Sequence, residues 1–278
     1  MEQFYDMHCH LGFAPEPAAA AAEAESAGIG GLSCTVEPAE YERLQGILAN
    51  ERNIALGLGA HPWWIADGRV GDAELERFCA LAPEASYIGE IGLDFVGPRD
   101  TEESRALQTA AFSRILAACN EDPPTNYAQR ESLSSCERSA TGTSETREKL
   151  VSIHAVNAAG AVLDLLEQAG TLARHHVVFH WFSGTTDDLA RAVHAGCFFS
   201  VGPRMLASRR GREYTRQIPL DRLLLETDMP SREGDPLPTN VWRAELGNAL
   251  AGIAQLKQLS HEDALSAIEQ TSARLLAV

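Results

Sequence analysis

Short apolar runs alternate with longer segments of helical periodicity along the whole chain, and this alternation restricts the fold more than any other feature. Continuous hydrophobic runs are typical of parallel strands buried on both faces. The eight runs lie at residues 5–10, 32–36, 55–59, 87–92, 151–156, 176–181, 197–201 and 222–228. Eight strands that alternate with helices predict a single α/β domain over residues 1–278, a closed (β/α)8 TIM-type barrel; a doubly wound open sheet is the second possibility.

One polar segment, residues 121–149, interrupts this alternation just before the fifth predicted strand. It is rich in Ser, Thr, Glu and Arg and has neither the helical nor the strand period. A structureless connection of this length is uncommon inside a compact domain. Because it leads from a helix into a strand, it belongs to the face of a barrel opposite the active site. We therefore expect a flexible insertion that is peripheral to the chemistry.

The charge balance limits the possible partners. A formal net charge of −16 argues against passive binding to long nucleic acid, but metal ions can still hold a phosphate substrate in an acidic protein. No apolar run approaches the length that crosses a bilayer, and residues 1–6 lack the basic and apolar stretches of a secretory signal. We expect a cytoplasmic protein that does not bind membranes.

Six residues with metal-binding side chains fall near the carboxyl ends of predicted strands. They are His8, His10, Glu90, His154, His180 and Asp228. Any one of these histidines could be an ordinary core residue, and either carboxylate could belong to a structural ion pair. Together, however, they would project toward the catalytic mouth of a parallel barrel. Four imidazoles and two carboxylates at one place suit Zn²⁺, Mn²⁺ or a similar divalent ion.

The chain also contains six short motifs, and five of them include these residues. In chain order they are Asp6 with His8-Cys9-His10, Gly59-Ala60-His61-Pro62, Gly89-Glu90-Ile91-Gly92-Leu93-Asp94, the strand ending at His154, His180-Trp181-Phe182-Ser183-Gly184, and Leu225-Glu226-Thr227-Asp228-Met229-Pro230. In this order they resemble the motifs of the TatD-family deoxyribonucleases over essentially the whole chain except residues 121–149. The resemblance implies a barrel of the amidohydrolase superfamily that is a hydrolase, with metal-dependent 3′–5′ exonuclease activity favouring single-stranded DNA.

The same resemblance implies a binuclear centre with two divalent ions about 3.5–4 Å apart. His8, His10 and Asp228 would hold one ion, His154 and His180 the other, and Glu90 would bridge them. The sequence does not decide between Zn²⁺, Mn²⁺ and Mg²⁺.

Two carboxylates are expected to take part in catalysis, Asp228 as the proton-transfer group as well as a ligand and Glu90 as the bridge. Asp6 could accept a hydrogen bond beside the ligands and set the geometry of its strand. Glu226 could orient a ligand or the substrate, or it could equally be an ordinary buried polar residue.

Three residues are candidate substrate contacts. His61 closes the third predicted strand, Arg204 follows the seventh and can form a fork with a phosphate, and Trp181 follows the sixth and could stack on a base. Two of them have an ordinary alternative: a structural turn for His61 and loop packing for Trp181.

One departure from the family leaves the substrate open. The chain reads Ala155-Val156-Asn157 after His154, where family members commonly carry an arginine two residues beyond the histidine. The predicted substrates are DNA ends or short single-stranded oligonucleotides. A small-molecule ester, lactone or amide hydrolase on the same barrel is the first alternative, and a catalytically silent metal-binding subunit of a complex is the second. The sequence identifies no protein partner.

Overall fold

The computed structural model describes residues 2–123 and 147–277, and within them eight parallel strands close into a barrel in the order β1 to β8. The strands are β1 (Phe4–Cys9), β2 (Ile29–Cys34), β3 (Ile54–Ala60), β4 (Tyr87–Asp94), β5 (Leu150–Val156), β6 (His176–His180), β7 (Phe198–Val201) and β8 (Leu223–Leu225). The predicted TIM-type barrel is therefore confirmed, and the open sheet is excluded because β1 pairs with both β2 and β8.

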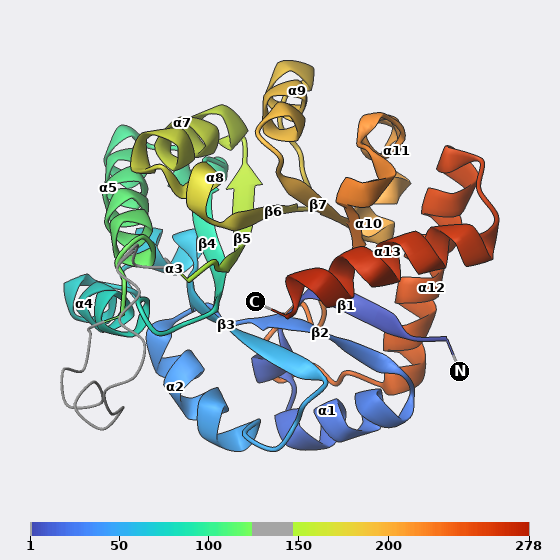
Figure 1. Cartoon of the computed structure of the whole chain (residues 1–278). Helices are drawn as coiled ribbons and strands as arrows, with labels where there is room; N and C mark the ends of the chain where they lie inside the picture. The colour runs from blue at the N-terminus through green and yellow to red at the C-terminus, as the bar shows by residue number, and fades with distance from the viewer. Residues whose placement is uncertain (1, 124–146, 278) are drawn as a thin grey trace, which may run out of the picture.

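Helices surround the barrel as an outer layer (Figure 1). The longer ones are α1 (Pro17–Ser26), α2 (Pro38–Ile47), α4 (Asp72–Leu81), α5 (Glu102–Cys119), α7 (Ala159–Ala169), α9 (Thr186–His194), α11 (Arg209–Gln217), α12 (Thr239–Lys257) and α13 (His261–Leu275). Short α-helical turns are α3 (Pro62–Ala66), α8 (Thr171–Arg174) and α10 (Pro203–Ala207), and the 3₁₀ turns are η1 (Leu11–Phe13), η2 (Gly97–Arg99) and η3 (Leu220–Arg222). Thr185 shows how the sequence starts such a helix: it exchanges hydrogen bonds with Asp188 in a capping box.

The apolar filling of the barrel lies toward the amino ends of the strands. A cluster of fully or almost fully buried side chains occupies it: Met7, Leu32, Cys34, Leu150, Val178, Phe198, Leu224 and Leu275. Helix α13 crosses this end of the barrel in Figure 1, and its last turn supplies Leu275. The amino end is thereby closed by packing, and polar side chains gather at the carboxyl end.

The chain enters β5 at the closed end of the barrel. Lys149 is buried there, and its ammonium group donates to the carbonyl oxygens of Ala82, Pro83 and Ala85 at 2.8–3.0 Å. The predicted insertion at 121–149 has residues 124–146 outside the described part of the chain, so its flexibility and peripheral role stay predictions. Among the described residues, no helix combines the length and apolarity needed to cross a membrane.

Candidate metal centre

The structure brings all six predicted ligand residues together at the carboxyl end of the barrel. His8 lies in β1, Glu90 in β4, His154 in β5 and His180 ends β6. His10 and Asp228 lie just outside the strands that were expected to contain them. The predicted strand 222–228 was too long, because β8 ends at Leu225 and Asp228, with a φ of 57°, donates its backbone N–H to the carbonyl of His8.

Irregular strand pairing aims two of these side chains into the barrel. The register between β1 and β2 shifts between Asp6 and Cys9, around His8. The register between β4 and β5 shifts between Ile88 and Ile91, around Glu90. Such irregularities redirect side chains next to active sites.

Glu90 is the centre of the cluster, since its side chain is only 2% exposed and five imidazoles surround it. Its Oε2 faces Nε2 of His8 at 3.4 Å and of His10 at 3.3 Å. Its Oε1 faces His154 Nδ1 at 2.6 Å, His180 Nε2 at 2.9 Å and His61 Nε2 at 3.3 Å. Burial by itself would raise the pKa of Glu90, but the charges and hydrogen bonds of these histidines hold it well below its usual range.

Asp228 lies beside His8 and His10, the two histidines that face Oε2 of Glu90. Its Oδ1 is 3.3 Å from His10 Nε2 and 4.0 Å from His8 Nε2. Burial would raise the pKa of Asp228, but the hydrogen bond and charge of His10 outweigh it and lower the pKa to about 2. The carboxylate is therefore ionised at neutral pH, as a ligand must be.

The ring nitrogens of His8 and His10 are arranged as metal ligands require. His10 donates Nδ1–H to the carbonyl of Cys34 at 3.1 Å, and His8 Nδ1 shares a hydrogen bond with the hydroxyl of Ser152 at 2.8 Å. Both rings therefore present Nε2 to the site, and His8 Nε2 is buried without a hydrogen-bond partner. Burial lowers the pKa of His8 to about 4, so its ring is neutral. A buried, neutral imidazole nitrogen without a partner fits a divalent cation.

His154 presents Nδ1 to the site, where His8 and His10 present Nε2, because of Asp94. No role was predicted for Asp94 from the sequence. Oδ2 of Asp94 lies 2.9 Å from Nε2 of His154 and also accepts the indole N–H of Trp63 at 2.6 Å. His154 Nδ1 therefore faces Glu90 and His180. Asp94 lies in the same motif as Glu90, which could have indicated that it belongs to the site. Nothing in the motif shows that it would bond to a ring nitrogen of His154, or to which one.

His61 reaches Glu90 but is not arranged as a ligand. Its Nδ1 accepts the backbone N–H of Trp63 at 3.1 Å, and burial lowers its pKa. A neutral imidazole carries one proton, so the proton lies on Nε2, which faces Glu90. His61 is a hydrogen-bond donor at this site, although one of its ring nitrogens lies within 4.8 Å of ligand atoms of Glu90 and His154.

Asp6 supports the strands that carry the ligands. It accepts hydrogen bonds from the backbone of His8 and Thr227, from the Thr227 hydroxyl at 2.5 Å and from the Trp242 indole at 2.6 Å. Its contacts on β1 and next to β8 tie together the segments that carry His8 and Asp228.

Glu226 lies beneath the cluster. Burial raises its pKa well above the usual range, and it accepts the Ser200 hydroxyl at 2.5 Å. Its Oε2 is 3.7 Å from Nδ1 of His180, too far for a hydrogen bond.

A cavity of about 770 Å³ opens over the cluster, within the size range of ligand sites. Trp181 and Arg204, both predicted as substrate contacts, lie on its wall. Trp181 is 37% exposed and has a φ of 38°, a backbone conformation that is rare for a bulky residue and is often found at functional sites. Arg204 donates to Asp228 Oδ2 at 3.1 Å and to the Ser231 hydroxyl, so it already lies beside a candidate ligand.

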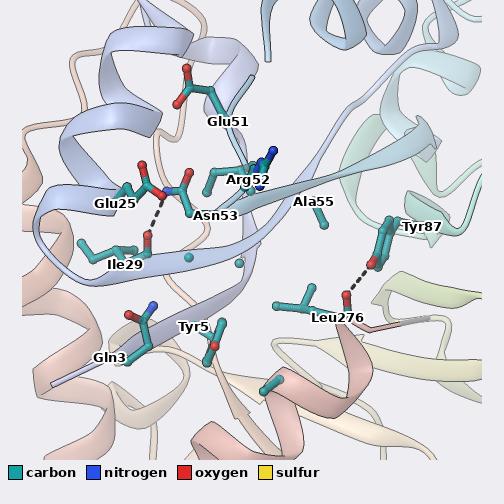
Figure 2. A pocket seen from close by; sticks show the side chains of 14 residues that line it. Gln3, Tyr5, Glu25, Ile29, Glu51, Arg52, Asn53, Ala55, Tyr87 and Leu276 are labelled. Carbon is teal, nitrogen blue, oxygen red and sulfur yellow. Dashed lines mark hydrogen bonds between the residues drawn. The ribbon is translucent and has the colours of Figure 1, made fainter. Parts of the chain in front are cut away.

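Another cavity, of about 670 Å³, lies at the closed end of the barrel beside Tyr5, Tyr87 and Leu276 (Figure 2). Its lining contains neither histidine nor cysteine. The Tyr87 hydroxyl donates to the carbonyl of Leu276, which fixes the end of the chain against β4. In barrel enzymes this end contributes to stability, so the candidate chemistry belongs to the opposite mouth.

A buried cluster of histidines and carboxylates at the mouth of a (β/α)8 barrel defines a metal-dependent hydrolase as the class of protein. The sequence matches the family described as TatD related DNase over residues 5–277. The chain belongs to this family, and the predicted metal-dependent hydrolase acting on phosphodiester bonds is confirmed at this level.

Individual relatives agree with this assignment. The chain is 29% identical over 222 residues to the 3′–5′ ssDNA/RNA exonuclease TatD of Escherichia fergusonii, covering 77% of this chain and 74% of that protein. It is 27% identical over 191 residues to human deoxyribonuclease TATDN3, covering 68% of this chain and 58% of that protein. The crystal structure of YjjV, a TatD homologue from Escherichia coli, shares the fold with a TM-score of 0.74 at 22% identity, covering 99% of this chain and 98% of that one.

Proposed function

We propose that this protein removes nucleotides from the 3′ ends of single-stranded DNA with the help of two divalent metal ions. The observation that carries the proposal is Glu90, a buried carboxylate with histidine nitrogens on both of its oxygens at the floor of an open cavity. A carboxylate in this position is suited to bridge two cations. The named activity of the relative in Escherichia fergusonii supports the choice of a nucleic-acid end as substrate.

The proposed ligands divide along the two oxygens of Glu90. His8, His10 and Asp228 would hold one ion on the Oε2 side. His154 and His180 would hold the other on the Oε1 side. The imidazoles favour Mn²⁺ or Zn²⁺, and the carboxylates leave Mg²⁺ possible.

The bound ions would supply Lewis acidity that activates water and offsets charge on the phosphoryl oxygens. Asp228 is ionised and 22% exposed in the cavity, so it is the carboxylate placed to accept a proton from the attacking water. The Nε2–H of His61 would donate to an oxygen of the phosphate.

Arg204 and Trp181 would bind the parts of the nucleotide that do not react. The guanidinium of Arg204 lies at the edge of the cluster, where it would contact a phosphate while holding Asp228. The ring of Trp181 would stack on a base, an interaction that tolerates any sequence.

The test uses a 5′-labelled single-stranded oligonucleotide with Mg²⁺, Mn²⁺ or Zn²⁺, and with EDTA as a control. Stepwise shortening from the 3′ end should be lost with EDTA and in Asp228→Asn. It should persist in Asp221→Asn, which makes the same change at a side chain 76% exposed. Intact DNA with folded, metal-loaded protein would refute the proposal and favour a small-molecule substrate.

A further inference from the structure

Two neighbouring cavities at the mouth of the barrel are separated by the same side chains. The cavity over the metal centre measures about 770 Å³, and the next one, toward η1 and α2, measures about 460 Å³. Phe13, Arg69 and Glu233 line both. Side chains that face two cavities at once form the wall between them.

Arg69 holds this wall together across three loops. Its Nε and Nη2 donate to the two carboxylate oxygens of Glu37, after β2, at 2.9 and 3.1 Å. Its Nη2 also donates to Glu233, after β8, at 3.0 Å. The guanidinium lies over the ring of Trp64, 3.8 Å from its centroid. Exposed ion pairs contribute little to stability, but a bidentate pair stacked on an indole fixes a side chain in one place.

The wall lies directly beside the candidate metal centre. The ring of Phe13 stacks on the ring of His10, with centroids 5.0 Å apart and planes 16° apart. The backbone N–H of Gly234 donates to the carbonyl of Phe13 at 2.8 Å, which fixes the loop that carries Glu233 against η1. A polynucleotide that passed over the metal centre in this direction would meet the wall within the span of one side chain.

The charges of the wall also oppose a continuing strand. Glu37 and Glu233 neutralise the guanidinium of Arg69 and add a second carboxylate. The far cavity is lined in addition by Glu40 and Arg43, so its lining carries three carboxylates and two guanidinium groups. A phosphodiester backbone leaving the metal centre on this side would have to approach carboxylates.

We propose that the bridge Glu37–Arg69–Glu233 makes the catalytic cavity blind on this side and restricts the enzyme to strand ends. An internal phosphodiester needs an exit for the chain on both sides of the metal centre, whereas a terminal one needs a single exit. This inference rests on the proposed function and assigns the restriction to strand ends to three residues.

The test compares linear and covalently closed circular single-stranded DNA of the same sequence, both internally labelled. Wild-type protein should degrade the linear form and leave the circle intact. In Arg69→Ala/Glu233→Ala, the rate of circle loss relative to the rate of linear degradation should rise at least about tenfold over wild type. Arg77→Ala is the matched control, since it removes an exposed ion pair with Glu42 and should behave as wild type.

Three other outcomes would count against the wall. Wild-type protein that opens the circle as fast as it degrades the linear strand would overturn it, while leaving phosphodiester hydrolysis intact. A double variant that degrades linear DNA normally but spares the circle would overturn it as well. If wild-type protein degrades neither substrate, the proposed function itself fails and the wall proposal fails with it.

Discussion

Asp94 offers the sharpest test of how the metal centre is organised, because among the described residues His154 is the candidate ligand that it contacts. Both of its oxygens accept hydrogen bonds: Oδ2 from His154 Nε2–H and Trp63 Nε1–H, and Oδ1 from the backbone N–H of Val96 at 3.1 Å. Asparagine has the same size but offers one oxygen and one NH₂ group. In Asp94→Asn at least one donor therefore faces another donor, whichever way the amide is turned.

The expected effect is a loss of metal affinity rather than of folding. Partners that orient a ligating histidine are typically worth 10- to 100-fold in metal affinity, about 1.4–2.8 kcal/mol. The whole range applies here, since the amide removes an acceptor either from His154, which is almost fully buried, or from the backbone N–H of Val96, which lies at the surface.

Titration calorimetry of Mn²⁺ or Zn²⁺ into metal-free protein measures this loss directly. The matched control is Asp100→Asn, whose carboxylate is 41% exposed and pairs with Arg105. We expect weaker binding in Asp94→Asn alone, with thermal unfolding near that of wild type. Equal affinity in wild type and Asp94→Asn would refute the assignment of His154 Nδ1 as a ligand held by Asp94.

Three further substitutions test the cavity, the support of the strands and a buried histidine far from the site. Trp181→Ala should raise KM for an oligonucleotide by about tenfold or more and leave KM for a small aryl phosphodiester unchanged; equal effects on both substrates would exclude stacking. Trp242→Phe removes an indole donor from the buried carboxylate of Asp6, so urea unfolding should show a loss of about 1–3 kcal/mol. Burial lowers the pKa of His175 from 6.5 to about 4, so the unfolded chain binds the extra proton and stability falls by up to about 3 kcal/mol between pH 6.5 and 4. His175→Gln should flatten this part of the stability profile, whereas an unchanged slope would show that other groups cause it.

The barrel could be predicted because burial on both faces leaves a direct trace in the sequence. The predicted strand 151–156 corresponds to β5 (Leu150–Val156), and 55–59 to β3 (Ile54–Ala60). The prediction was wrong where hydrogen bonding replaced strand pairing. Residues 226–228 continue the pattern of β8, and Glu226 still donates its backbone N–H to Val201 of β7, but Asp228 has a positive φ and donates to His8 of β1 instead.

The set of metal-binding side chains could also be predicted, because parallel strands bring their carboxyl ends to one place. The sequence could not show contacts between loops that are far apart along the chain. Arg69 reaches Glu37 and Glu233 across separations of 32 and 164 residues, and no periodicity records such a contact. The aromatic support of Arg69 by Trp64 is equally invisible before the loops are placed.

The orientation of each imidazole ring lies beyond what strand patterns can encode. A strand position decides whether a histidine faces the site, but the group on the opposite ring nitrogen decides what the histidine can do there. The carbonyl of Cys34 directs Nε2 of His10 toward Glu90 and Asp228, and Asp94 directs Nδ1 of His154 toward Glu90. The backbone N–H of Trp63 occupies the lone pair of His61 and leaves a proton facing Glu90. His10 and His154 are therefore suited to bind a cation and His61 to donate a hydrogen bond, although all three lie within 3.3 Å of Glu90. A carbonyl or carboxylate holds the ring proton on the nitrogen that faces away from the site. An N–H donor leaves the proton on the nitrogen that faces the site.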